Sequence, residues 1–254
     1  MNRRPLTEPL RPLLWFAAGA CVVTALLTRA VLFPLAGPAH VTAAEQQTKP
    51  EPTLQPGDCH LGSSRVYVFV GKTGFGHEHA IEGRLKSGAL HLSDRPASGR
   101  LVFDMTSFAA DTPGARKYIG LAGVTDPETQ KKVNANMLGP DVLDVRRFPA
   151  AGFMLTAVTP LQQQSRRGLP QYQLDGQFTL HGVTRPVRIV AETETKGTWL
   201  HLRGSFAIRQ TDFGITPFST AFGAVGVTND LRIYGDLWVA QPGPVTERSP
   251  QDRR

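Results

Sequence analysis

The chain has 254 residues, 41% of them hydrophobic, and its 28 Lys and Arg against 21 Asp and Glu give a formal net charge of +7. This composition is that of a globular protein and excludes a collagen-like or wholly disordered chain. The basic residues are spread out and are not interleaved with aromatic side chains, so we expect no nucleic-acid partner.

Residues 1–36 are predicted to form an N-terminal transmembrane anchor or signal segment. Basic residues precede an apolar run at 13–28, and Arg29 follows it. As a helix this run spans about 24 Å, and its continuation to Leu35 brings it close to the roughly 30 Å of a membrane core. We favour an uncleaved anchor with the rest of the chain outside the cytoplasm, while a cleaved signal peptide with small residues at 41–43 is the alternative. Both interpretations predict export to the bacterial cell envelope, with the anchor holding the domain at the inner membrane.

The remaining chain divides into a linker, one folded domain and a tail. Residues 37–57 are rich in Pro, Gln, Glu and Thr and predict a linker, and the polar residues 241–254 predict a disordered tail. The folded domain is therefore expected at 58–240. Cys21 lies inside the apolar run and Cys59 outside it, so we expect no disulfide between them. Too few apolar residues precede Cys21 to favour lipoprotein processing.

Alternation of apolar and polar residues with a period of two predicts strands through the domain. Eight such segments are expected, at 65–70, 80–92, 99–105, 151–157, 171–180, 186–194, 199–209 and 230–239. Strands that bury one face pair antiparallel, and eight of them can close into a barrel without exposed edges. The fold class is therefore predicted to be all-β, an antiparallel eight-stranded barrel with one short inserted helix.

That helix is expected at 127–138. Asp126 is a suitable N-cap, Pro127 suits the first helical position and Glu128 complements the positive end of the helix dipole. Gly139 follows the last helical residue. We expect the helix to cover one end of the barrel.

A hairpin is predicted at 174–190, LDGQFTLHGVTRPVRIV. Phe178 and Leu180 share the buried face of the first strand. Gly182 supplies a turn position, and Pro186 lies near the start of the next strand, where its missing N–H costs least.

Four segments of the domain resemble, in order, the YceI-like family of bacterial polyisoprenoid- and lipid-binding proteins. The segments are residues 64–85 with GFGHEHAIEGRL, 137–153 with MLGPDVLDVRRFPAAGF, 178–187 with FTLHGVTRPV and 206–215 with FAIRQTDFGI. The resemblance implies a lipocalin-like barrel with an apolar tunnel for a long isoprenoid or other lipid chain. It implies no catalytic residues and no cofactor. The anchor and the longer insertion at 109–136 depart from the family pattern.

The inward-facing side chains are the candidate wall of this tunnel. They are Phe103, Met105, Phe153, Phe178, Leu180, Leu202, Phe206, Leu231 and Ile233. Alternation alone favours a packed core, since a small eight-stranded barrel can fill itself with side chains. The family resemblance shifts the prediction to a cavity.

His77 and His79 are the candidate polar mouth of the tunnel. They lie two residues apart and share the face of Ile81 if the strand begins there. A metal site needs three or four ligands, and His181 and His201 are expected to face outward, so we predict no metal site.

Other polar motifs are given ordinary roles. Residues 212–214, Asp-Phe-Gly, are expected to form a turn, since neither a glycine-rich phosphate loop nor a kinase catalytic loop accompanies them. Four aspartates are expected to be solvated or to cap the helix, namely Asp111, Asp126, Asp141 and Asp144.

The sequence thus predicts a non-catalytic protein that binds or carries a polyisoprenoid or other amphiphile in the cell envelope, tethered to the membrane by its anchor. The alternative is an interaction module with a filled barrel, which presents Trp199, Tyr234 and Trp238 to a protein partner. A third hypothesis, a metal-dependent enzyme at His77 and His79, predicts stoichiometric metal in the purified protein.

Overall fold

A computed structural model describes residues 54–93 and 96–242. The predicted anchor, nearly all of the predicted linker and most of the predicted tail lie outside these residues. Residues 51–254 form a compact unit by themselves, and the pairings that close its sheet and its hydrophobic core lie within residues 59–239. No helix in the described part of the chain is long and apolar enough to span a membrane.

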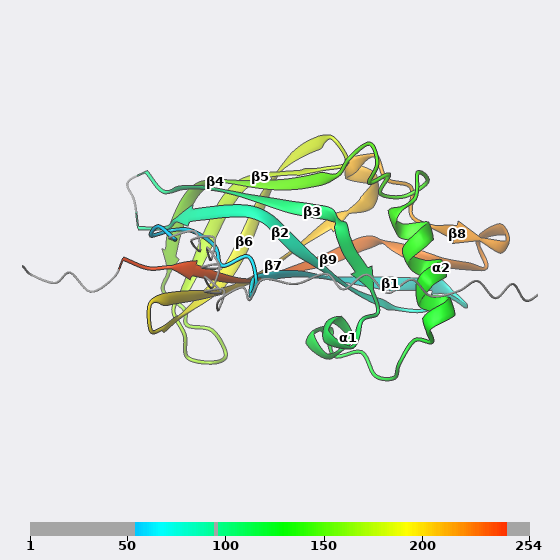
Figure 1. The fold of residues 1–254 in the computed structure, drawn as a ribbon, viewed down its shortest axis with the longest axis horizontal. Coiled ribbons are helices and arrows are strands. Elements are labelled where there is room, and N and C mark those ends of the chain that lie inside the picture. The colour runs from blue at the N-terminus through cyan, green and yellow to red at the C-terminus, as the bar shows by residue number, and fades with distance from the viewer. Residues whose placement is uncertain (1–53, 94–95, 243–254) are drawn as a thin grey trace, which may run out of the picture. The chain divides into compact units, whose positions relative to one another are not determined.

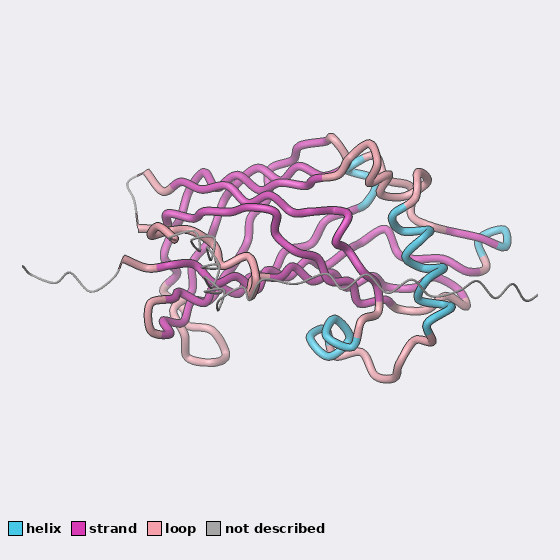
Figure 2. The backbone as a smooth tube through the Cα atoms, viewed as in Figure 1, coloured by secondary structure: helices cyan, strands magenta, loops and turns pink. Residues whose placement is uncertain are grey.

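The described residues form an antiparallel barrel, shown in Figures 1 and 2. Each of the first seven strands pairs with the next, β7 pairs with β9, and β9 pairs with β1, so that eight strands close the sheet. A two-residue strand, β8, lies beside β9 outside this ring. The strands are β1 (Arg65–Gly74), β2 (His79–His91), β3 (Ser98–Ala110), β4 (Ala150–Leu161), β5 (Gln171–Leu180), β6 (Val183–Lys196), β7 (Trp199–Arg209), β8 (Ser219–Thr220) and β9 (Val225–Ala240).

The barrel follows from the alternation in the sequence, because one face of each strand turns inward. In β5, Leu174, Gly176, Phe178 and Leu180 are buried, while the residues between them are more exposed. The eight predicted strand segments fall on the eight strands of the ring, except for Leu92 just past the end of β2, and several strands extend beyond their predicted ends. The predicted antiparallel eight-stranded barrel is confirmed.

The predicted hairpin is formed by β5, β6 and the two residues between them. His181 has φ of 51° and Gly182 has φ of 76°, so both turn residues adopt the left-handed backbone conformation. Two consecutive positive φ angles are typical of the type I′ turn, whose twist matches that of the flanking strands. The ring of His181 packs on that of Phe148, with ring centroids 4.2 Å apart.

Helix α2 (Pro127–Leu138) has the predicted bounds. The carboxylate of Asp126 accepts a hydrogen bond from the Thr129 N–H at 3.0 Å, which is the expected N-cap. Val133 and Met137 of α2 border the interior of the barrel, and Figure 1 shows the helix lying across one end of the strands.

A second helix, α1 (Pro113–Ile119), corrects the prediction of a single inserted helix. Thr112 caps its start through the Ala115 N–H, and Gly120 ends it with φ of 87°. Both signals are present in the sequence, but the helix is only seven residues long and shows little apolar periodicity. It lies against the outer wall of the barrel, where the ring of Tyr118 stacks on that of Tyr67 with centroids 3.8 Å apart.

The predicted turn at the Asp-Phe-Gly sequence is confirmed. Residues Gln210–Phe213 form a short 3-10 helix that ends at Gly214 with φ of 70°. Phe213 is 1% exposed, because its ring fills space beside Phe178.

Candidate functional site: an apolar cavity with a polar mouth

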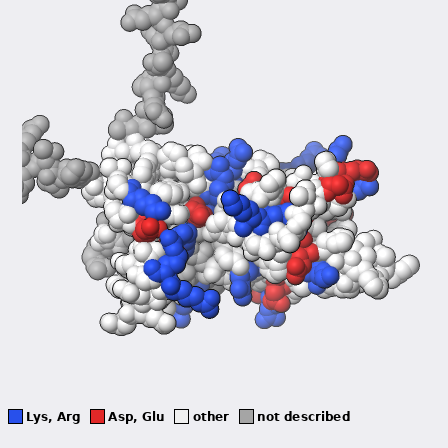
Figure 3. Space-filling model, turned by 90° about the horizontal axis from the view of Figure 1, so that it is seen from below, with Lys and Arg blue, Asp and Glu red and all other residues white. Residues whose placement is uncertain are grey.

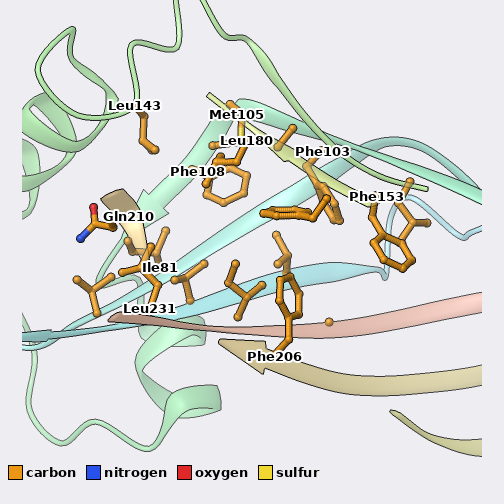
Figure 4. Close-up of a pocket in the computed structure, with 18 of the residues that line it drawn as sticks. Ile81, Phe103, Met105, Phe108, Leu143, Phe153, Leu180, Phe206, Gln210 and Leu231 are labelled. Carbon is orange, nitrogen blue, oxygen red and sulfur yellow. The ribbon is translucent and has the colours of Figure 1, made fainter. Parts of the chain in front are cut away.

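The barrel encloses a cavity of about 210 Å³. Its lining is almost wholly apolar and comes from the strands of the barrel, from α2 and from the segment that follows α2. Figure 4 shows Phe103, Phe153 and Phe206 pointing into it, with Leu143 and Gln210 at one end. In proteins, a cavity of about 150 Å³ with such a lining stays dry and binds small apolar molecules.

All nine side chains predicted to form a tunnel wall border this cavity. They are Phe103, Met105, Phe153, Phe178, Leu180, Leu202, Phe206, Leu231 and Ile233. Their placement follows from strand alternation, whereas the empty space between them does not.

Small residues on inward-facing positions help to explain that space. Gly204 of β7 and Gly235 of β9 lie directly opposite each other in the sheet and both border the cavity. Ala151 and Ala191 border it as well. Large aromatic rings elsewhere in the wall pack against one another, as do Phe178 and Phe206 with centroids 5.4 Å apart. The open space lies beside Gly235, where an added Cβ would meet only Leu237 Cγ at 3.9 Å, whereas a Cβ at Gly204 would lie 2.9 Å from Ala191 and Ile189.

Among the described residues, three polar side chains border the cavity: His79, Asn136 and Gln210. Gln210 is 4% exposed, and its amide donates to the Thr228 carbonyl at 2.8 Å. Asn136 is an exposed residue of α2. We call the end of the cavity bordered by these three residues the mouth. No sequence pattern indicates Asn136 or Gln210, since neither differs from the polar residues around it in the chain.

His79 belongs to a buried ionic group that we call the mouth cluster, consisting of His79, Asp111 and Arg116. Nδ1 of His79 lies 2.7 Å from Oδ2 of Asp111, and the Arg116 guanidinium donates to Oδ1 at 3.0 Å. The Ala80 N–H also donates to Oδ1, at 3.1 Å. Burial tends to raise the pKa of the Asp111 carboxyl, but the hydrogen bonds from His79, Ala80 and Arg116 outweigh it and hold that pKa below its usual value.

Asp111 was expected to be solvated or to act as a cap, and this expectation was wrong. Its side chain is 1% exposed, and its φ of 56° bends the chain at the end of β3. Its partners lie 32 residues before it and 5 residues after it, so spacing in the sequence could not reveal the group.

The structure separates the two histidines of the predicted mouth. His79 borders the cavity, while His77 is exposed, precedes β2 and does not line the cavity. No three His, Cys, Asp or Glu side chains gather closely enough for a metal ion within residues 54–93 and 96–242.

The outer-wall aromatics of the interaction-module hypothesis pack against the chain itself. Trp238 stacks on His201 with ring centroids 4.1 Å apart, Tyr234 meets Tyr118 of α1 edge to face at 6.1 Å, and Trp199 meets the ring of His60 at 5.1 Å. These contacts leave the rings partly covered, which argues against a ready surface for a protein partner.

His201 was expected to face outward, and it does, but it is buried under another side chain. His201 is 7% exposed, and its Nε2 lies 2.6 Å from Oδ1 of Asp236. It does lie on the outer side of β7, because its neighbour Leu202 borders the cavity. Trp238 covers it, which the alternation pattern could not show.

Comparison with known proteins places this fold. A UPF0312 protein of Pseudomonas putida (strain W619) is 36% identical over 99 residues, which cover 37% of this chain and 46% of that protein. The chain therefore matches less than half the length of that relative.

Two solved structures are similar. Burkholderia cenocepacia BcnA has 18% identity and a TM-score of 0.51, with 72% of this chain and 100% of that chain covered. A polyisoprenoid binding domain from Saccharophagus degradans, implicated in plant cell wall breakdown, has 10% identity and a TM-score of 0.49, with 74% and 100% covered. Residues 59–237 match the family model of the YceI-like domain. Since that match extends over more than half of the chain and over the whole barrel, the chain belongs to the YceI-like family.

Proposed function

We propose that this protein binds and carries a polyisoprenoid or another long-chain lipid in the cavity of its barrel, without chemistry of its own, in the bacterial cell envelope. The observation that carries the proposal is the apolar cavity of about 210 Å³ inside the closed barrel. A filled barrel, as the interaction-module hypothesis requires, would leave no such space.

The apolar wall is suited to a chain of several isoprene units. A buried CH₂ group contributes roughly 0.8 kcal/mol, so one five-carbon unit contributes about 4 kcal/mol before costs. Association costs about 4–15 kcal/mol, because the ligand loses translational and rotational freedom. Roughly three or more units are therefore needed for micromolar binding, which favours long chains over small apolar molecules.

The mouth cluster is suited to the polar end of such a lipid. When Nδ1 of His79 donates to Asp111, the neutral ring leaves Nε2 as an acceptor. Nε2 forms no hydrogen bond with the described residues. It is therefore available to accept from a hydroxyl group of a ligand, and in the protonated ring it donates instead.

The test is to fill the cavity without adding a polar group. A Cβ added at Gly235 would meet only Leu237 Cγ, at 3.9 Å, so a larger side chain at this position enters the cavity without striking the backbone. Gly235→Phe should lower the lipid recovered by organic extraction and mass spectrometry of the purified protein at least tenfold.

Gly152→Phe is the matched control. Gly152 lies on the outer wall of β4 between the inward-facing Ala151 and Phe153, and a Cβ there would meet only the Leu101 carbonyl, at 3.6 Å. This variant should keep its lipid. Extracts of the unaltered protein that repeatedly contain no lipid, or equal lipid in both variants, would contradict the proposed function.

A further inference from the structure

Two phenylalanines project into solvent at the same end of the barrel. Phe75 is 85% exposed and Phe222 is 112% exposed, that is, more exposed than in an extended reference chain. A single exposed apolar side chain needs no explanation, but a contiguous exposed apolar surface often marks an interaction site.

These two side chains lie on neighbouring turns. Phe75 follows β1, and Phe222 lies in the short 3-10 turn Ala221–Gly223 that precedes β9. The Phe75 N–H donates to the Ala224 carbonyl at 2.9 Å, and Gly74 is opposite Val225 in the sheet. We call these paired turns the aromatic tip.

The tip is held in an unusual backbone conformation. Ala221 has φ of 50° and Phe222 has φ of 54°, values that L-residues other than glycine seldom adopt. Each such residue strains the backbone, and residues held in this way cluster at functional sites. Here the conformation keeps the Phe222 ring off the protein surface.

The Phe222 side of the tip lacks charge, whereas the exposed Lys72 and Glu78 flank Phe75 on the other side. Residues 213–229 contain no Lys, Arg, Asp or Glu, and charged residues resume on both sides at Asp212 and Asp230. In Figure 3 the end of the molecule that carries β8, on the right, is correspondingly white. A projecting segment that is itself free of charge, bordered by charged residues such as Lys72, is suited to shallow entry into the interface of a bilayer, where a buried charge would be costly.

The tip is continuous with the mouth of the cavity. Phe218 and Val227 both border the cavity, and the Val227 N–H donates to the Phe218 carbonyl at 3.1 Å. The segment between them is the part that projects and carries Phe222. The segment that carries Phe222 therefore leaves the cavity wall at Phe218 and returns to it at Val227.

We propose that the aromatic tip inserts into the surface of a lipid bilayer, so that the mouth takes up or releases its ligand there. The inference rests on the proposed function, because a cavity for membrane lipids needs an apolar passage to the membrane. A protein partner fits the tip less well. A stable protein interface buries about 800 Å² on each side, and two narrow turns offer no such face.

The test measures binding of residues 51–254, which form a compact unit of their own, to sedimented vesicles of phosphatidylethanolamine and phosphatidylglycerol in a 3:1 ratio. Replacement of both rings, Phe75→Ser with Phe222→Ser, should lower the partition into vesicles about tenfold or more, since two aromatic side chains lose their burial. The loss should persist in 0.5 M salt, which suppresses attraction between the basic protein and the anionic vesicle surface.

Met154→Ser is the matched control, because Met154 is 52% exposed on the outer wall of β4, away from the tip. It should bind vesicles like the unaltered protein, and circular dichroism should show all variants folded. Equal binding by the double variant, or no vesicle binding at all, overturns the inference. Loss of self-association in the double variant, without vesicle binding by any variant, also overturns it and makes the tip a contact between copies.

The outcome separates this inference from the proposed function. Lipid supplied from detergent micelles bypasses the bilayer, so the double variant should still acquire bound lipid by that route. If the double variant binds vesicles normally and lipid is recovered from its cavity, the tip inference fails and the proposed function stands. If no route loads lipid although the tip binds vesicles, the proposed function fails.

Discussion

Replacement of Asp111 by asparagine tests whether the mouth cluster is an ionic group that stabilises the fold. Asparagine has nearly the same shape and, like aspartate, tolerates the left-handed backbone at this position, where φ is 56°. The variant therefore removes the negative charge from between His79 and Arg116 with little change in packing or backbone preference.

The magnitude follows from the contacts of the carboxylate. Its side chain is 1% exposed and accepts hydrogen bonds from His79, Ala80 and Arg116. A hydrogen bond to a charged group contributes about 1.5–3 kcal/mol, and loss of one partner of a buried ion pair costs about 3–5 kcal/mol. Since the amide oxygen of asparagine can still accept from Ala80 and Arg116, we expect a loss of about 2–3 kcal/mol, or roughly 4–12 °C in Tm for a domain of this size.

Urea unfolding at several pH values measures this loss and identifies its cause. The folded-state pKa of Asp111 lies below the ordinary value, so its charge stabilises the fold fully above the unfolded pKa of about 3.9. That stabilisation is lost as the pH falls through the folded-state pKa. The stability difference between the unaltered protein and Asp111→Asn should therefore be full at neutral pH and shrink below about pH 4.

Asp212→Asn supplies the control, because the Asp212 side chain is 53% exposed and lies 4.0 Å from Arg209. An exposed pair contributes about 0–1 kcal/mol, so this variant should change the free energy of unfolding little. The reasoning is refuted if Asp111→Asn unfolds at the same urea concentration as the control. It is also refuted if its deficit is undiminished well below pH 4.

Three further predictions concern other parts of the fold. Gly182→Ala should lower the free energy of unfolding by about 1–2 kcal/mol, because the φ of Gly182 is 76° and a Cβ would lie 2.9 Å from the Phe148 ring. An unchanged Tm in thermal unfolding would contradict the left-handed conformation of this turn residue. Burial raises the pKa of Cys59 to about 12, so in a Cys21→Ser chain iodoacetamide at pH 8 should label it only after unfolding, and rapid native labelling would count against its burial. Asp126→Ala should destabilise α2 through loss of its N-cap, seen as faster hydrogen exchange in α2 alone; exchange unchanged throughout α2 would argue against the cap.

The barrel was predictable because its information is local. Alternation assigns each strand an inner and an outer face, so Phe178 and Leu180 could be placed on the wall before any pairing was known. The cap and first-turn residues of α2 likewise act within a few residues of one another. The resemblance to a family added the expectation of a cavity, which alternation cannot distinguish from a packed core.

The polar part of the site was not predictable in this way. The mouth cluster joins His79 to Asp111 across 32 residues, and no periodicity connects them. His77 differs from His79 only in preceding the strand, so the spacing of the two histidines could not rank them. His201 faces outward as expected, yet the ring of Trp238 from another strand covers it. Each of these features depends on contacts that form only when the barrel closes.

The two ends of the barrel differ in polarity, and we propose that this difference orients the ligand. At the end away from α2, the backbone of Cys59 forms an isolated β-bridge with Val239, and Leu155 is 4% exposed. None of these three borders the cavity, although Leu90, which lies in the same cross-strand row as Leu155, does. The polar cavity-lining residues lie towards the other end, with the aromatic tip beside them. In the proposed function, the polar group of the lipid lies near His79 and its chain extends along the apolar wall away from α2, so a lipid drawn from a bilayer enters tail first.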